Sequence, residues 1–169
     1  GLPGIAPAAN FLLYRAEDDA DESPVEEDHL ADAIVRAMDH DAQILSISLG
    51  YRFTSDYDKV GLHPWTEFDG RTLVASRAAA AAARRGALVV VASGNDGRLG
   101  GRSIGSPADA ESVLTVGAIH ESHDPCAFSS WGPTADGRSK PEVVAFGCDV
   151  PVAGALGEKS IDLNGAGTS

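Results

Sequence analysis

The segment of the sequence best suited to covalent chemistry is NGAGTS, residues 164–169. Small residues lead into Ser169, as they do where a backbone turns tightly to present a hydroxyl group. A serine hydroxyl becomes a strong nucleophile only when a neighbouring base accepts its proton. The segment therefore makes Ser169 a candidate reactive group of an enzyme, and the plainer alternative is a loop built of small residues.

A second polar group, the Asn95 amide, follows the apolar run ALVVVASGN (87–95). Such an uninterrupted run is typical of a strand that is covered on both faces of a parallel sheet. Ligands of open parallel sheets bind beyond the carboxyl ends of the strands, where Asn95 would stand with its amide free to donate hydrogen bonds. An asparagine before Asp-Gly is also common turn chemistry, so this signal alone is weak.

The sequence offers five histidines that might act as a base. A general base must lie within hydrogen-bond reach of the hydroxyl that it activates, and no sequence context brings a histidine to Ser169. We therefore expect all of them to be exposed and non-catalytic: His29, His40, His63, His120 and His123.

Motifs for metals and cofactors do not match. His120-Glu121-Ser122-His123 is one residue short of the metalloprotease H-E-x-x-H, and with Cys126 it would bind at most adventitious zinc. The acidic stretch 17–28 lacks the spacing and the glycine of a calcium-binding EF-hand, and no G-x-G-x-x-G is present. We expect no metal and no cofactor.

Apolar runs alternate with helical patterns, which predicts an α/β fold: a three-layer α/β/α arrangement around a mostly parallel sheet. Ser23 as N-cap with Glu26 predicts a capping box at the start of the first helix, and Gly86 suits the end of the second. The predicted strands lie near 10–15, 43–48, 88–93, 113–118 and 142–146, and the predicted helices near 24–39 and 71–85.

Composition sets broad limits on the protein. Its 169 residues make one domain, with 13 basic and 25 acidic residues and a net charge of -12. Polyanions would be repelled, so we expect neither nucleic acid nor a membrane surface as a partner. Cys126 and Cys148 are either two free thiols or, in an oxidising compartment, a disulfide.

Taken together, six segments resemble the subtilisin-like serine proteases, the subtilases, in the order of that family and over nearly the whole chain. The resemblance implies a subtilisin-like α/β fold. The segments are GIAPAA (4–9), SISLG (46–50), VVVASGNDG (89–97), SPADAESVLTVGAI (106–119), FSSWGPTADGRSKPEVVAFG (128–147) and GTS (167–169).

The resemblance implies a serine endopeptidase, with a peptide or protein as its substrate. It makes Ser169 the catalytic nucleophile and Asn95 the oxyanion-binding amide. Because the pocket segments carry no charged side chain, we expect a preference for an apolar or aromatic residue before the scissile bond. The segments that would wall the substrate pocket are Ser48, Leu49 and Gly50 on one side and Ala92, Ser93 and Gly94 on the other.

The same resemblance implies that residues 1–169 are a partial, incomplete catalytic domain. The catalytic aspartate and histidine of the family belong to segments before GIAP, so we expect Ser169 to be idle in this chain alone. The missing N-terminal part of the domain is expected to pack against the chain, and the family favours a secreted or extracytoplasmic location. The alternative is a non-catalytic, peptide-binding pseudoenzyme fragment.

Overall fold

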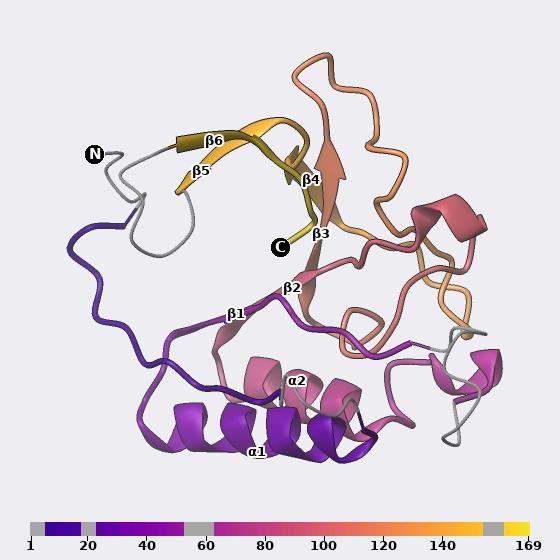
Figure 1. Cartoon of the computed structure of the whole chain (residues 1–169). Coiled ribbons are helices and arrows are strands. Elements are labelled where there is room, and N and C mark those ends of the chain that lie inside the picture. Colours follow the sequence, from indigo (N-terminus) through magenta and orange to yellow (C-terminus); the bar gives the residue numbers. More distant parts are fainter. Residues whose placement is uncertain (1–5, 18–22, 53–62, 154–160) are drawn as a thin grey trace.

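The centre of the fold is a parallel four-stranded sheet (Figure 1). The structure is a computed structural model that describes residues 6–17, 23–52, 63–153 and 161–169. The strands follow one another in chain order, with Ile44 paired to Leu88 and Val116 to Val143. They are β1 (Ile44–Ile47), β2 (Leu88–Ala92), β3 (Leu114–Ile119) and β4 (Val143–Phe146), so four of the five predicted strands are confirmed.

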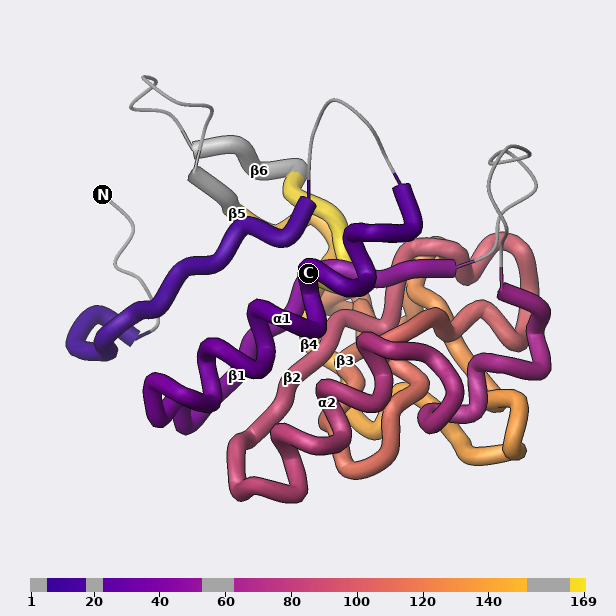
Figure 2. The backbone as a smooth tube through the Cα atoms, turned by 90° about the horizontal axis from the view of Figure 1, so that it is seen from below, coloured from indigo at the N-terminus to yellow at the C-terminus, as the bar shows by residue number. Residues whose placement is uncertain are grey.

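Helices α1 (Val25–Asp39) and α2 (Val74–Arg84) confirm the two predicted helices. They lie side by side along one face of the sheet, as Figure 2 shows from below. Their alanine-rich contact permits close packing, with Ala75 and Ala79 completely buried. Gly86 follows α2 with φ +100°, a left-handed conformation that ends a helix at little cost only in glycine. Neither these nor the other described helices have the length and apolar character required to cross a bilayer.

The opposite face of the sheet is open in the described residues. Burial alternates along β1, so Leu45 and Ile47 are buried whereas Ile44 remains 64% exposed. Leu88, the partner of Ile44 in register, is 49% exposed. The parallel α/β fold is thus confirmed with one helical layer in place, and an apolar face is available for a second.

An antiparallel hairpin leads back to the C-terminus. It consists of β5 (Val150–Ala153) and β6 (Ile161–Gly165), and it was not among the predicted elements. Short 3-10 turns at Trp65–Glu67 and Gly97–Leu99 complete the elements. The hairpin brings the last residues to a point beyond the carboxyl ends of β1 and β2 (Figure 1).

The predicted strand near 10–15 is wrong. Residues 9–17 carry no regular secondary structure, and the side chains of Phe11 and Leu13 are 70% and 89% exposed. A strand requires a neighbouring strand that pairs with its backbone N–H and C=O groups. In the described sheet β1 pairs with β2 alone, so residues 10–15 do not pair along its other edge. An apolar run of four residues does not by itself determine whether a pairing strand is present.

The predicted capping box at Ser23 is also wrong. The N-cap of α1 is Pro24, with no side-chain capping hydrogen bond, and the Glu26 N–H donates to the carbonyl of Ser23. Glu26 is buried, with 5% of the residue exposed. Burial therefore overrides the local capping preference.

The two cysteines form a disulfide. Cys126 and Cys148 are bonded through their sulfur atoms, with their Cα atoms 6.4 Å apart. This resolves the alternative that the sequence left open in favour of the pair. The bond joins the loop after β3 to the segment that enters the β5–β6 hairpin.

Candidate active site

A cavity of about 290 Å³ opens where β1 and β2 end, and all eight predicted site residues line it. We call it the edge cavity. The carboxyl edge of a parallel sheet is where such a site is expected. Its lining consists of Glu17, Ser48, Leu49, Gly50, Arg52, Ala92, Ser93, Gly94, Asn95, Asp96, Ser103, Gly105, Ala108, Thr168 and Ser169.

The first wall continues from β1. Ser48 and Gly50 are exposed and Leu49 is half-buried, so this segment presents backbone to the cavity. Directly after it, Tyr51 and Ser106 form an antiparallel bridge with N···O distances of 2.7 and 3.0 Å. A Cβ atom on Gly105 would lie 2.6 Å from the Tyr51 carbonyl oxygen, so this close approach requires glycine. The bridge to Ser106 and the close approach of Gly105 therefore hold the first wall in position.

The second wall continues from β2 and turns at Gly94. The Ser93 N–H donates to the Val116 carbonyl, and the Ser130 N–H donates to the Gly94 carbonyl, both at 2.9 Å. Gly94 has φ +102°, and a Cβ atom there would lie 2.9 Å from Ser130 Oγ. Only glycine satisfies both the conformation and the space. The turn thereby sets the direction in which Asn95 leaves the strand.

Asn95 and the segment of Ser169 are joined by direct hydrogen bonds. Asn95 Oδ1 accepts from the Thr168 backbone N–H at 3.1 Å and from Thr168 Oγ1 at 3.2 Å. Thr168 Oγ1 in turn accepts from the Gly94 N–H at 3.1 Å. Because a backbone N–H can only donate, the amide oxygen must face Thr168, and the Nδ2 donor is left for another acceptor.

Three charged side chains also line the edge cavity, and the sequence interpretation missed them. Arg52 and Asp96 lie 3.7 Å apart, and Glu17 joins them from the N-terminal segment. Arg52 Nη1 and Ser93 Oγ are buried with no hydrogen-bond partner among the described residues. The two predicted pocket segments, 48–50 and 92–94, carry no charged side chain, and the charges come from other parts of the chain. Asp96 directly follows Asn95, and this adjacency was the available signal.

A buried polar network supports the first wall from α2. The Ser76 hydroxyl donates to Asp109 Oδ1 and lies 2.8 Å from the Ser106 hydroxyl. Asp109 Oδ2 accepts from the Gly70 N–H at 2.7 Å. Burial raises the pKa of Asp109, against the lowering effect of the Ser76 hydrogen bond.

The described residues that line the edge cavity include no histidine. His29, His40 and His123 are exposed, as expected, but His63 and His120 are half-buried, so the expectation of exposure is wrong for these two. His63 is held between Glu67 at 2.8 Å and Glu27 at 3.0 Å. A general base for Ser169 is thus not visible in the described part of the cavity.

The chain belongs to the subtilase family. The sequence profile of that family, named Peptidase_S8, matches residues 1–168. The match agrees with the parallel α/β fold described above.

Two bacterial proteases illustrate the relationship. A thermophilic serine proteinase of Bacillus sp. (strain AK1) is 30% identical over 150 residues, which is 89% of this chain and 30% of that protein. The serine protease AprX of Bacillus subtilis (strain 168) is 37% identical over 81 residues, 44% of this chain and 18% of that protein. The chain therefore spans less than a third of the length of either relative.

Solved structures agree in fold. The patellamide maturation protease PatA is 28% identical with a TM-score of 0.63, and the match covers 89% of this chain and 47% of that chain. The prenylagaramide maturation protease PagA is 27% identical with a TM-score of 0.60, covering 88% of this chain and 46% of that one. The subtilisin-like α/β fold is shown by these similarities.

Proposed function

We propose that the protein is a serine endopeptidase that hydrolyses peptide bonds by acyl transfer, with Ser169 as nucleophile and Asn95 as oxyanion donor. The observation that carries this proposal is the hydrogen-bonded link from Asn95 Oδ1 to Thr168, which seats Ser169 in the same cavity as the amide. Family membership supports the reaction class.

The chemistry follows from these positions. Ser169 Oγ attacks the scissile carbonyl carbon while a histidine takes the hydroxyl proton. The negative charge that develops on the carbonyl oxygen is stabilised by the Asn95 Nδ2 amide and the Ser169 backbone N–H. The histidine then gives the proton to the leaving amine, and the C–N bond breaks. Water, activated by the same base, hydrolyses the acyl-enzyme and restores the serine.

The histidine and its orienting aspartate come from residues other than the described lining of the edge cavity. We place them in a further part of the catalytic domain, which makes residues 1–169 a partial domain. The exposed apolar side chains of Ile44 and Leu88 and of the segment 11–14 support a packing surface for that part. In the 169-residue chain alone, Ser169 is therefore expected to be unreactive.

The substrate is an extended peptide that pairs with the backbone of residues 48–50. Its side chain before the scissile bond enters between this wall and residues 92–94. Residues 48–50 and 92–94 carry no charged side chain, and Arg52 and Asp96 pair with one another at 3.7 Å, so an apolar or aromatic side chain is the proposed occupant between the two walls. The -12 net charge supports a substrate other than nucleic acid.

A secreted or extracytoplasmic location is part of the proposal. The Cys126–Cys148 disulfide supports it, because disulfides persist in oxidising compartments.

The function is tested by peptide cleavage in the full-length protein. We expect hydrolysis of an unstructured protein substrate, and a loss of about 10⁴-fold or more in kcat for Ser169→Ala, because the acyl-enzyme cannot form. Ser122→Ala is the matched control, since Ser122 is exposed and does not line the edge cavity. A full-length protein that binds the peptide without cleaving it would instead identify the non-catalytic alternative.

A further inference from the structure

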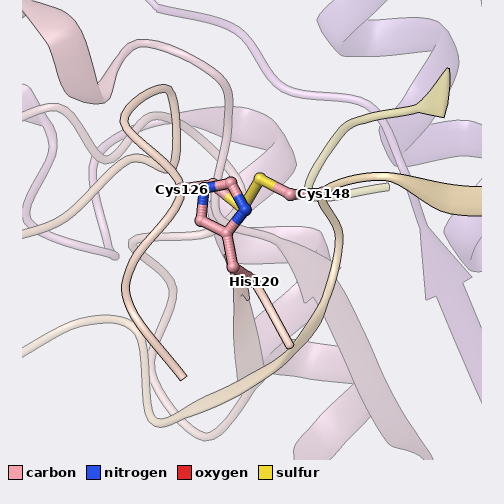
Figure 3. Close-up of side chains that lie close together, drawn as sticks. All are labelled: His120, Cys126 and Cys148. Carbon is pink, nitrogen blue, oxygen red and sulfur yellow. A yellow bond between two sulfur atoms is a disulfide. The ribbon is translucent and has the colours of Figure 1, made fainter. Parts of the chain in front are cut away.

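Three metal-ligating side chains gather beyond the carboxyl ends of β3 and β4, outside the lining of the edge cavity. One ligand atom from each of His120, Cys126 and Cys148 lies within 4.8 Å of the others (Figure 3). His120 follows β3 directly, Cys126 lies on the segment that returns beside β3, and Cys148 is two residues beyond β4. The two sulfur atoms are bonded to each other in the structure, and the His120 ring lies against them.

The backbone around this cluster is fixed by hydrogen bonds that do not depend on the disulfide. The Cys126 N–H donates to the Ala118 carbonyl at 2.9 Å, and Pro125 pairs with Ile119. The Gly147 N–H donates to the Ile119 carbonyl at 3.1 Å. The three ligands would therefore remain neighbours if the sulfur–sulfur bond opened.

The cluster suits a tetrahedral zinc ion. Zn–S bonds of about 2.3 Å and Zn–N bonds of about 2.0 Å place tetrahedral ligand atoms about 3.5–3.8 Å apart, and the three observed atoms lie within 4.8 Å. Cys126 and Cys148 are 2% and 8% exposed, whereas the His120 side chain is 43% exposed and leaves a route from solvent. Asp149 Oδ2 lies 3.7 Å from His120 Nδ1, where its negative charge favours a bound cation.

We propose that the reduced chain binds one Zn²⁺ through His120, Cys126 and Cys148, with water at the fourth position, and that the disulfide is the oxidised state of the same centre. A dithiol reductant supplies two electrons and two protons to the disulfide, which gives two thiols, and is itself oxidised to a disulfide. Zinc then binds the two sulfurs as thiolates, and their two protons pass to solvent.

The disulfide state and the zinc-bound state would both restrain the segment that contacts residues 167–169. Gly147, next to Cys148, accepts a hydrogen bond from the Gly167 N–H at 2.9 Å. A disulfide or a zinc ion ties this segment to the loop after β3. The centre would thus keep residues 167–169 in position in an oxidising or in a reducing compartment.

Cobalt uptake by the reduced 169-residue chain tests the proposal. Co²⁺ replaces Zn²⁺ in tetrahedral sites, and thiolate ligands give it a charge-transfer band in the near ultraviolet. We expect one Co²⁺ per chain, displaced by one equivalent of Zn²⁺. His120→Ala should weaken binding about 10-fold or more, since it removes one of three protein ligands. His123→Ala should bind as the wild type, because its ring contacts Phe146 and it is outside the cluster.

The variant His120→Ala keeps both cysteines, so its disulfide and its folding can be verified before reduction. The proposal is overturned if the reduced chain takes up no metal, whether it stays folded or unfolds by circular dichroism. It is equally overturned if His120→Ala binds as tightly as His123→Ala, or if the oxidised chain binds as the reduced one does.

Discussion

Asn95 accepts two hydrogen bonds from Thr168 with its Oδ1 and lines the edge cavity, and we propose that its Nδ2 is the oxyanion donor. Replacing Asn95 by alanine in the full-length protein should lower kcat by about 10²–10³-fold with little change in KM, because an oxyanion donor acts in the transition state. Steady-state kinetics on a peptide substrate measures both constants. Asn10→Ala, an exposed asparagine outside the cavity, is the control. A rise in KM with an unchanged kcat would assign Asn95 to ground-state binding.

Arg52 balances the charge of Asp96 in the same cavity. Arg52→Gln removes the cation that pairs with Asp96, so we expect selectivity to shift toward lysine or arginine before the scissile bond, by about 10-fold in kcat/KM. A peptide library assayed with the full-length protein measures the shift. Arg98→Gln, which changes the same charge outside the cavity, should leave selectivity unaltered. A shift of equal size in both variants would indicate a general charge effect.

At the scale of elements, the network through Asp109 couples α2 to the wall at Tyr51. Burial raises the pKa of Asp109 in the folded state above its ordinary 3.8. At pH values between 3.8 and this higher pKa, Asp109 is protonated in the folded chain and ionised in the unfolded chain. Its contribution to stability is present at low pH and is lost as pH rises through the folded-state pKa. The free energy of unfolding of the wild type relative to Asp109→Asn should therefore fall as pH rises above the ordinary pKa of 3.8.

Urea denaturation of the 169-residue chain at several pH values measures this difference. Asp136→Asn provides a control of opposite sign. Burial acts to raise the pKa of Asp136, but hydrogen bonds from Arg138 and Thr134 lower it below 3.8. The free energy of unfolding of the wild type relative to Asp136→Asn should therefore increase as pH rises through the lowered pKa of Asp136. Parallel trends for the two variants would contradict the assignment at Asp109.

The sequence predicted the elements whose signals are local. Helical periodicity and Gly86 located both helices, and buried apolar runs located the four paired strands. The prediction of a strand at residues 10–15 was wrong because strand formation depends on a pairing partner, which the apolar run at these residues does not encode. The hairpin of β5 and β6 was missed because its alternating residues are few and interrupted by Pro151.

For the site, the small-residue turns drew attention to Asn95 and Ser169, and the resemblance to the subtilases implied their roles and both walls. The structure brings all of these residues to one cavity. Of the charged lining residues, Asp96 could have been found from its adjacency to Asn95, whereas Glu17 and Arg52 could not. Glu17 and Arg52 reach the cavity through loops whose course depends on tertiary packing. The neighbourhood of Cys126, Cys148 and His120 likewise depends on how β3 and β4 pair.

At the scale of the whole molecule, the chain contains the proposed nucleophile, the proposed oxyanion donor and both proposed substrate walls, whereas the described lining of its cavity contains no histidine. Activity should therefore depend on further residues of the full-length protein that complete the cavity. The open apolar face of the sheet is the surface on which such residues would pack.

The central claim, that Ser169 is an activated nucleophile in the complete enzyme, is tested most directly by a fluorophosphonate probe with peptide mass mapping. The probe bonds to a serine only when a base activates it, as catalysis requires. We expect stoichiometric labelling of Ser169 in the full-length protein, and none in its Ser169→Ala variant or in the 169-residue chain. Labelling at another serine, or none in the full-length protein, would contradict the account.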